Sequence, residues 1–153
     1  MIIAVVMSMA LWFGMRVMPM VQTLDPVSLA SGPIYNEIIY HAVHGRWPSA
    51  GDPTIVAGSN KSTYVKNFTL DGNGVVTAHV ALGAIPGFGS ASSAAAANTI
   101  HGSLSFRPEL LGSRDAPTVT FLCGYAQPVA DPVATIGSNR TTLDKRVLPP
   151  FCR

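Results

Sequence analysis

The chain contains only two cysteines, Cys123 and Cys152, and both lie in its last fifth. An even number of cysteines in a segment rich in loop-forming residues is typical of a disulfide bond, which forms in an oxidising compartment. The same count also fits two unpaired thiols in a reducing compartment. Composition alone therefore favours a cross-linked C-terminal segment and leaves a pair of free thiols as the alternative.

Two histidines, His41 and His44, are three residues apart in a predicted helix, a spacing at which both can bind one metal ion. No cysteine or carboxylate at a matching spacing completes a site, so we expect them to be interface or surface residues. His79 and His101 fall on predicted strands, where no partner can be deduced for either. The serines lack the Gly-x-Ser-x-Gly motif of hydrolases. We expect no enzyme activity, no cofactor and no metal.

The composition points to a membrane segment or a large subunit interface. Charged residues make up only 12% of the 153 residues, whereas hydrophobic residues make up an ordinary 48%. The net charge is +2, and the basic residues are scattered rather than gathered in a stripe, so nucleic-acid binding gains no support. The 14 glycines and 12 prolines favour a loop-rich domain over a helical bundle.

The N-terminal segment is long enough to cross a membrane. Met1–Met15 has no charged side chain, and after Arg16 the uncharged run continues to Leu24. A membrane helix needs roughly 20 mostly apolar residues, and an arginine near the interface can extend its charge to water. We predict an apolar helix over residues 1–24 that acts as a membrane anchor.

Two other interpretations of residues 1–24 stay open. A cleaved signal peptide needs a basic region before the apolar run and a small-residue cleavage site after it, and neither is evident. A buried core helix is the third interpretation. The orientation is also open, because Arg16 on the C-terminal side of the run disfavours export of the remaining chain, whereas a disulfide requires that export.

A second helical region comes after the apolar run. Asp25-Pro26 predicts a helix start with Asp25 as the N-cap, and Gly32-Pro33 predicts a break or kink. A further helix is expected over about Pro33–His44, ending at Gly45. Its apolar residues share one face or lie beside it: Ile34, Ile38 and Ala42, with Tyr35 and Ile39 alongside. Glu37, the only acid in this helix, is expected on a solvated face or in a subunit contact.

The rest of the chain predicts an antiparallel sheet. Asp71-Gly72-Asn73-Gly74 is a strong hairpin turn, because glycine and asparagine tolerate positive φ. The four expected strands are Tyr64–Leu70, with strict alternation of its faces, Val75–Leu82, Thr99–Arg107 and Thr118–Cys123. Gly83–Asn98 is a small-residue loop. The fold class is therefore α+β, with a helix on a four-stranded antiparallel sheet in one domain over residues 25–153.

Five segments, taken in order, resemble the globular part of a type IV pilin. They are Leu29–Gly32 with the helix exit Gly45–Pro48; Tyr64–Lys66 with Gly72–Ala78; Leu104–Pro108, a third strand ending in proline; Phe121–Gly124; and Thr141–Lys145 with Leu148-Pro149 and Cys152-Arg153. The resemblance covers about residues 29–153. It implies a disulfide between Cys123 and Cys152 that closes a C-terminal loop.

The N-terminal segment departs from the family pattern. Pilins have a glutamate at the fifth position of the mature chain and a short basic leader before it, whereas this chain has Val5 and no acid before Asp25. The chain therefore resembles a divergent or N-terminally altered pilin.

The resemblance implies a structural subunit of a pilus-like filament that acts in adhesion, motility or DNA uptake. Its expected partners are further copies of itself through the apolar helix, other pilins, the bacterial inner membrane before assembly, and a host surface or other ligand at the C-terminal loop. The expected location is the inner membrane and then the extracellular pilus. The alternative is a membrane-anchored extracytoplasmic binding protein that does not polymerise.

Overall fold

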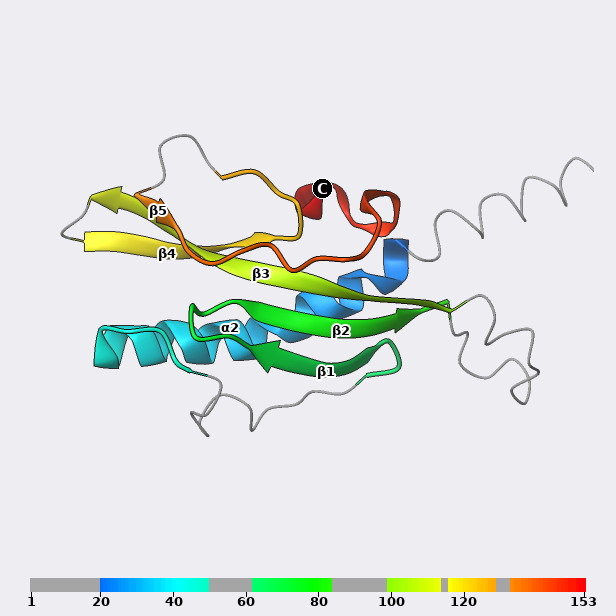
Figure 1. Cartoon of the computed structure of the whole chain (residues 1–153), viewed down its shortest axis with the longest axis horizontal. Helices are drawn as coiled ribbons and strands as arrows, with labels where there is room; N and C mark the ends of the chain where they lie inside the picture. The colour runs from blue at the N-terminus through cyan, green and yellow to red at the C-terminus, as the bar shows by residue number, and fades with distance from the viewer. Residues whose placement is uncertain (1–19, 50–61, 84–98, 114–115, 129–132) are drawn as a thin grey trace, which may run out of the picture.

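A computed structural model describes residues 20–49, 62–83, 99–113, 116–128 and 133–153 (Figure 1). Its elements are helix α2 (Leu24–His44), strands β1 (Val65–Leu70), β2 (Val76–Leu82), β3 (Ile100–Ser113), β4 (Ala116–Cys123) and β5 (Ala134–Thr135), and the 3-10 turns η1 (Lys145–Val147) and η2 (Pro150–Cys152). The predicted loop Gly83–Asn98 lies outside the described residues except for its first residue.

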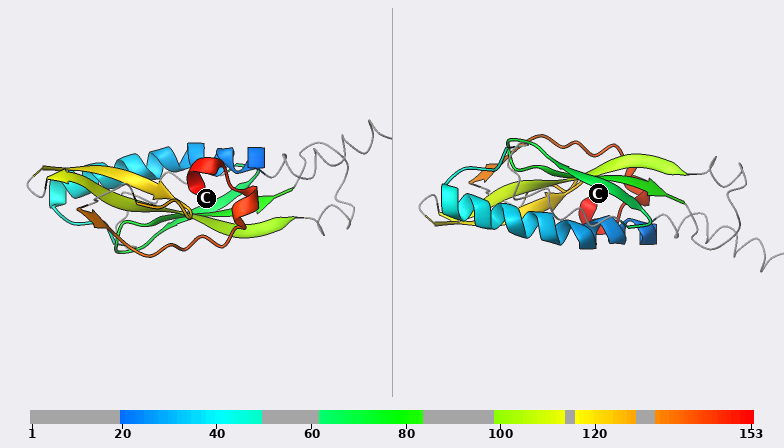
Figure 2. Two further views of the ribbon diagram at one scale, coloured as in Figure 1. Left: turned by 90° about the horizontal axis from the view of Figure 1, so that it is seen from above. Right: turned by 90° about the horizontal axis from the view of Figure 1, so that it is seen from below.

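The described residues form three layers (Figure 2). Helix α2 lies along one face of an antiparallel sheet with the order β1-β2-β3-β4, and β5 adds to β3. The stretch from β5 to η1 runs across the opposite face, which we call the outer face. The predicted α+β fold, one helix on an antiparallel sheet of four main strands, is therefore confirmed.

Helix α2 is longer than predicted and is not broken at Gly32-Pro33. Proline inside a helix removes one hydrogen bond and costs about 3 kcal/mol. Pro33 is buried against the sheet, so packing of the whole helix offsets this cost. The start also differs, because Thr23 rather than Asp25 is at the N-cap position. The predicted end is correct: Gly45 has φ 67°, and its N–H donates to the carbonyl of His41.

The helix packs on the sheet through a different face from the predicted one. The buried side chains recur every three or four residues, at Pro26, Ala30, Pro33, Glu37 and Tyr40. The face with Ile34, Ile38 and Ala42 lies to one side of this contact and is only half-buried or exposed. Counting apolar residues missed the true face because two prolines and a glutamate occupy it.

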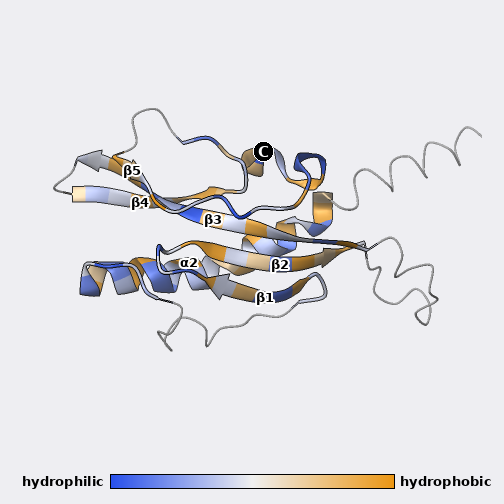
Figure 3. Cartoon of the chain, viewed as in Figure 1, coloured by the Kyte–Doolittle hydropathy of each residue, from blue (hydrophilic) through white to orange (hydrophobic). Residues whose placement is uncertain are grey.

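The core lies between α2 and the inner face of the sheet and draws most of its members from β2 and the first half of β3. It comprises Ala30, Val65, Val76, Ala78, Val80, Leu82, Leu104, Phe106, Cys123, Leu143, Leu148 and Cys152. The ribbon of β2 is mostly coloured hydrophobic in Figure 3. The prediction that the faces of β1 alternate strictly is wrong, because this strand contains a bulge. Val65 pairs with Val80 and Asn67 with His79, which leaves Lys66 as the extra residue.

Strand β3 continues through Pro108 to Ser113, so the prediction that it ends at the proline is wrong. Its first half pairs with β2, and its second half pairs with β4 on one side and the two-residue β5 on the other. The carbonyl of Pro108 accepts from the N–H of Ile136 beside β5. The missing N–H of the proline falls on this same, weakly paired side, where its absence costs little.

Among the described residues, no helix is long and apolar enough to cross a bilayer. Residues 1–19 of the predicted apolar helix lie outside the described part of the chain. Residues 20–22 are helical and lead into α2. The transmembrane helix over residues 1–24 therefore stays a prediction.

Candidate functional site

Cys123 and Cys152 lie at disulfide distance, with their Cα atoms 4.6 Å apart. Cys123 ends β4 and Cys152 lies in η2, 29 residues further along the chain. Both are buried in the main core, because the segment after β4 returns to the sheet and packs its own apolar residues against it. The structure thus contains the disulfide pairing, rather than two separated thiols, and the bond closes a C-terminal loop.

Backbone contacts hold the two ends of this loop together beside the sulfur atoms. Gly124 adopts φ 58°, and a side chain there would run into the carbonyl oxygen of Cys152. This close approach lets the N–H of Tyr125 donate to the same carbonyl oxygen at 2.9 Å. The glycine is therefore required both for its positive φ and for the space it leaves.

Hydroxyl groups attach the loop to the outer face of the sheet. The N–H of Ser103 donates to the hydroxyl of Thr142 at 2.9 Å, and the N–H of Ser105 donates to that of Thr141 at 3.1 Å. The hydroxyl of Ser103 donates to the carbonyl of Arg140 at 2.6 Å. These short polar side chains take the place of a neighbouring strand along the first half of β3.

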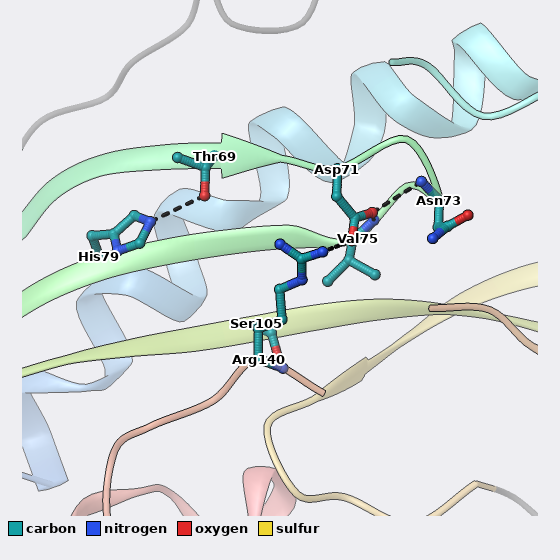
Figure 4. A network of polar contacts seen from close by, with 7 residues as sticks. All are labelled: Thr69, Asp71, Asn73, Val75, His79, Ser105 and Arg140. Atoms are coloured by element: carbon teal, nitrogen blue, oxygen red, sulfur yellow. Dashed lines mark hydrogen bonds and ion pairs between the residues drawn. The ribbon is translucent and has the colours of Figure 1, made fainter. Parts of the chain in front are cut away.

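An ion pair extends this attachment to the β1–β2 turn (Figure 4). The guanidinium of Arg140 lies 3.0 Å from the carboxylate of Asp71. The other carboxylate oxygen of Asp71 accepts from the N–H groups of Asn73 and Val75, which fixes the turn. The C-terminal loop is therefore connected across the sheet to a turn in the first hairpin.

The end of the chain also contacts the start of the helix. The hydroxyl of Thr23 donates to the carbonyl of Val147 at 3.0 Å. The guanidinium of Arg153 donates to the carbonyl of Leu148 and lies 3.8 Å from the sulfur of Met20. The C-terminus thus reaches the point where the N-terminal segment enters the described domain.

The side of α2 turned away from the sheet carries a row of exposed apolar side chains, which we call the helix stripe. Its large members are Val21, Leu24, Tyr35, Ile39 and Val43, which are 45–73% exposed. Ser28 and Gly32 are also exposed and lie in the gap between Leu24 and Tyr35. With them included, successive members of the row are three or four residues apart, which places them on one side of the helix. The stripe contains no charged residue. Sequence reasoning placed Tyr35 and Ile39 beside the apolar face but did not identify the stripe itself.

Glu37 is fully buried between α2 and the sheet, so the expectation of a solvated position or a subunit contact is wrong. Neither carboxylate oxygen has a hydrogen-bond partner among the described residues. Burial, with a smaller contribution from the nearby carboxylate of Asp71, raises the pKa of Glu37 to about 9. The side chain is thus a neutral carboxylic acid near pH 7. The signal for its burial was its spacing from Ala30, Pro33 and Tyr40.

The histidines near the helix end pack against aromatic rings. The ring of His41 stacks on Trp47 at 4.2 Å, and that of His44 stacks on Tyr40 at 4.1 Å. No cluster of three or more metal-ligating side chains occurs in the part of the chain that the structure describes. His79 and His101, which had no deducible partner, line one pocket on the outer face.

No protein-family profile matches this chain, and no curated protein matches it either.

Proposed function

We propose that this protein is a structural subunit of a type IV pilus-like surface filament, acting in adhesion, motility or DNA uptake. The observation that carries the proposal is the helix stripe. Large contiguous apolar patches are rare on proteins that act alone in water and are typical of surfaces that other molecules cover. Five large apolar side chains lie in one row with no charge among them, as two groups on either side of Ser28 and Gly32, and such a row fits a surface that another molecule covers.

A second copy of the same chain is the occupant that best fits the stripe. The row runs along one side of α2 and of the helical residues that lead into it, so the same row on another copy offers a complementary surface. Exposed Ser28 and Gly32 in the middle of the row allow close approach of the two backbones. The row begins at Val21, inside the predicted apolar segment 1–24, whose preceding residues would lengthen it.

The two sides of the domain support the same arrangement. The sheet covers the side of α2 opposite the stripe, and the stretch from β5 to η1 crosses the far face of the sheet before the end of the loop returns to the start of α2 (Figure 2). When helices pack together in the centre of a filament, the sheet and loop face outward. In this proposal the loop is the part that meets a host surface, and residues 1–24 lie in the inner membrane before assembly.

The proposal is tested by shearing surface material from cells that produce the full chain, imaging it by electron microscopy and identifying the chain by mass spectrometry. Ile39→Arg introduces a charge into the stripe between Tyr35 and Val43, whereas Thr118→Arg introduces the same charge at an exposed position on β4. We expect filaments from the unmodified chain and from Thr118→Arg. We expect at least about ten-fold less Ile39→Arg in the sheared fraction, because an unpaired charge would be buried.

Recovery of the unmodified chain only as a membrane-bound monomer would overturn the filament proposal. That outcome would favour the alternative function, a membrane-anchored extracytoplasmic binding protein that does not polymerise. Equal recovery of Ile39→Arg and Thr118→Arg in filaments would show that the stripe is not the assembly surface.

A further inference from the structure

The outer face of the sheet contains an open pocket with a volume of about 480 Å³. This lies within the range of small-molecule sites, roughly 300–1,000 Å³. Three neighbouring strands and the C-terminal loop contribute its polar lining, which comprises Lys66, His79, His101, Ser103 and Thr142. None of these residues belongs to the helix stripe, so the pocket is a separate feature.

The topology brings these side chains together in two ways. The bulge in β1 inserts Lys66 as an extra residue between Val65 and Asn67, and bulges commonly redirect a side chain in this manner. The antiparallel register pairs His79 with Ser103, and Ala81 with His101. The two histidines are therefore diagonal neighbours on adjacent strands, at a spacing of roughly 7–8 Å between Cα atoms.

Part of the pocket wall is held rigidly by contacts within the chain. The ring nitrogen Nε2 of His79 lies 3.0 Å from the hydroxyl of Thr69 on β1 (Figure 4), which fixes the orientation of the imidazole. The hydroxyls of Ser103 and Thr142 lie 3.1 Å apart and join β3 to the loop. At Gly102 any side chain would collide with Leu143, so the loop lies directly against the strand.

Two cationic or hydrogen-bond-donating groups in the pocket are available to a ligand. The side chains of Lys66 and His101 make no hydrogen bond or ion pair in the part of the chain that the structure describes, and both are exposed. The lysine ammonium has three donors and no acceptor, and an imidazole has at least one N–H in every tautomer. No acidic residue is among those that line the pocket.

We propose that this pocket binds a small anionic molecule through a carboxylate or phosphate group. The ammonium of Lys66 supplies the charge that selects an anion, and the imidazole of His101 supplies a donor from β3. His79 adds a donor through Nδ1 in the tautomer in which its Nε2 accepts from the hydroxyl of Thr69. The pocket lies on the outer face, opposite α2, so packing of copies through the helix stripe leaves it open. The inference therefore does not depend on the proposed function.

The test monitors the four histidine ring signals by NMR at constant pH and ionic strength. The full chain is kept in a non-ionic detergent and titrated separately with inorganic phosphate, glucuronate and neutral glucose. We expect phosphate or glucuronate to shift the signals of His79 and His101 in a saturable way, while glucose does not. His41 and His44 lie on α2 and serve as internal controls that should not move. Saturation by phosphate alone identifies a phosphate group, and saturation by glucuronate alone identifies a carboxylate.

Two variants test the role of the lysine with net charge held equal. Lys66→Gln removes the cation from the pocket, whereas Lys145→Gln removes one that lies over the ring of Tyr125, 5.0 Å from its centroid. We expect Lys66→Gln to raise the dissociation constant roughly 2- to 5-fold, as an exposed ion pair allows, and Lys145→Gln to leave it unchanged. Equal shifts of all four histidines, no saturable shift, or equal affinities of the two variants would overturn the proposal.

Discussion

The two faces of the sheet are covered by different means. The inner face is covered by α2 through apolar side chains such as Val76, Val80 and Leu104, which are at most 3% exposed. The outer face is covered by the C-terminal loop, which depends on hydrogen bonds from the hydroxyls and N–H groups of Ser103 and Ser105. Apolar contact is non-directional and tolerates small shifts of the packed elements, whereas these hydrogen bonds require one register of the loop relative to β3.

The outer face is held by a small number of specific links. The outer contacts join residues of β3 to residues 34–39 positions later, and the disulfide spans 29. Apart from these links the loop is held on the sheet mainly by two buried apolar side chains, Leu143 and Leu148, since its regular structure is a two-residue strand and two short turns. The inner face should therefore determine whether the domain folds, and the outer face whether its C-terminus stays attached.

Breaking the disulfide is the strongest test of this difference. Closing a loop of this length contributes about 3–4 kcal/mol in the chain-entropy model. We expect the variant Cys123→Ser/Cys152→Ser, or chemical reduction, to lower the free energy of unfolding by about this amount. In hydrogen exchange the amides from Thr118 to Arg153 should lose protection first, while those of α2 and β2 keep theirs.

The position of the lost protection is the critical readout. A uniform loss of protection over the whole domain would mean that the two faces unfold as one unit, which would contradict their separate roles in stability. If both cysteines of protein from an oxidising compartment react freely with an alkylating reagent, the disulfide is absent. The loop is then not closed, and the expected difference between the two faces has no basis.

The inner face has one weakness, the buried carboxyl of Glu37. Its pKa is about 9 in the folded chain against 4.5 as the ordinary value. Between these values the unfolded chain has released the proton while the folded chain retains it. The contribution of Glu37 to the free energy of unfolding is therefore fully present below about pH 4.5. It falls as the pH rises towards 9, by at most about 1.4 kcal/mol per pH unit.

Glu37→Gln keeps the shape and stays neutral at every pH, so it should remove this part of the pH dependence. In urea unfolding we expect the free energy of unfolding of the unmodified chain to fall between pH 5 and pH 8 relative to that of Glu37→Gln, by up to about 4 kcal/mol. All other ionisable groups titrate in both proteins and cancel in the difference. Parallel profiles would show that Glu37 is ionised and solvated, contrary to its position on the inner face.

Sequence patterns predicted the inner face better than the outer one. The four main strands, the turn at Asp71 and the helix end at Gly45 result from local rules of alternation and positive φ, and they were predicted, apart from the end of β3 and the short β5. The helix face was predicted wrongly, because its buried positions include Pro33 and Glu37. Burial of these residues depends on the sheet beneath them, which no local pattern contains.

The outer face was not predicted from the residues themselves. Ser103, Thr141 and Thr142 are ordinary polar residues in the sequence, and only the three-dimensional path of the loop pairs them. The pocket has the same origin, since the bulge at Lys66 and the register of His79 relative to β3 are properties of strand pairing. The cysteine pair alone indicated that the C-terminal segment returns to the sheet.

The smallest predicted effect tests whether the outer face acts as one unit. Ser105 is fully buried, and its hydroxyl donates to the side-chain oxygen of Asn139 at 2.8 Å and accepts from the N–H of Arg140 at 3.1 Å. Ser105→Ala should cost about 1–2 kcal/mol in the oxidised protein, whereas Thr118→Ala, at an exposed position on β4, should cost less than about 0.5 kcal/mol. In the reduced protein the loop is already released, so the cost of Ser105→Ala should fall towards that of the control. An equal cost with and without the disulfide would mean that the hydroxyl contacts persist on their own, and that hydrogen bonds rather than the covalent link hold the loop on the sheet.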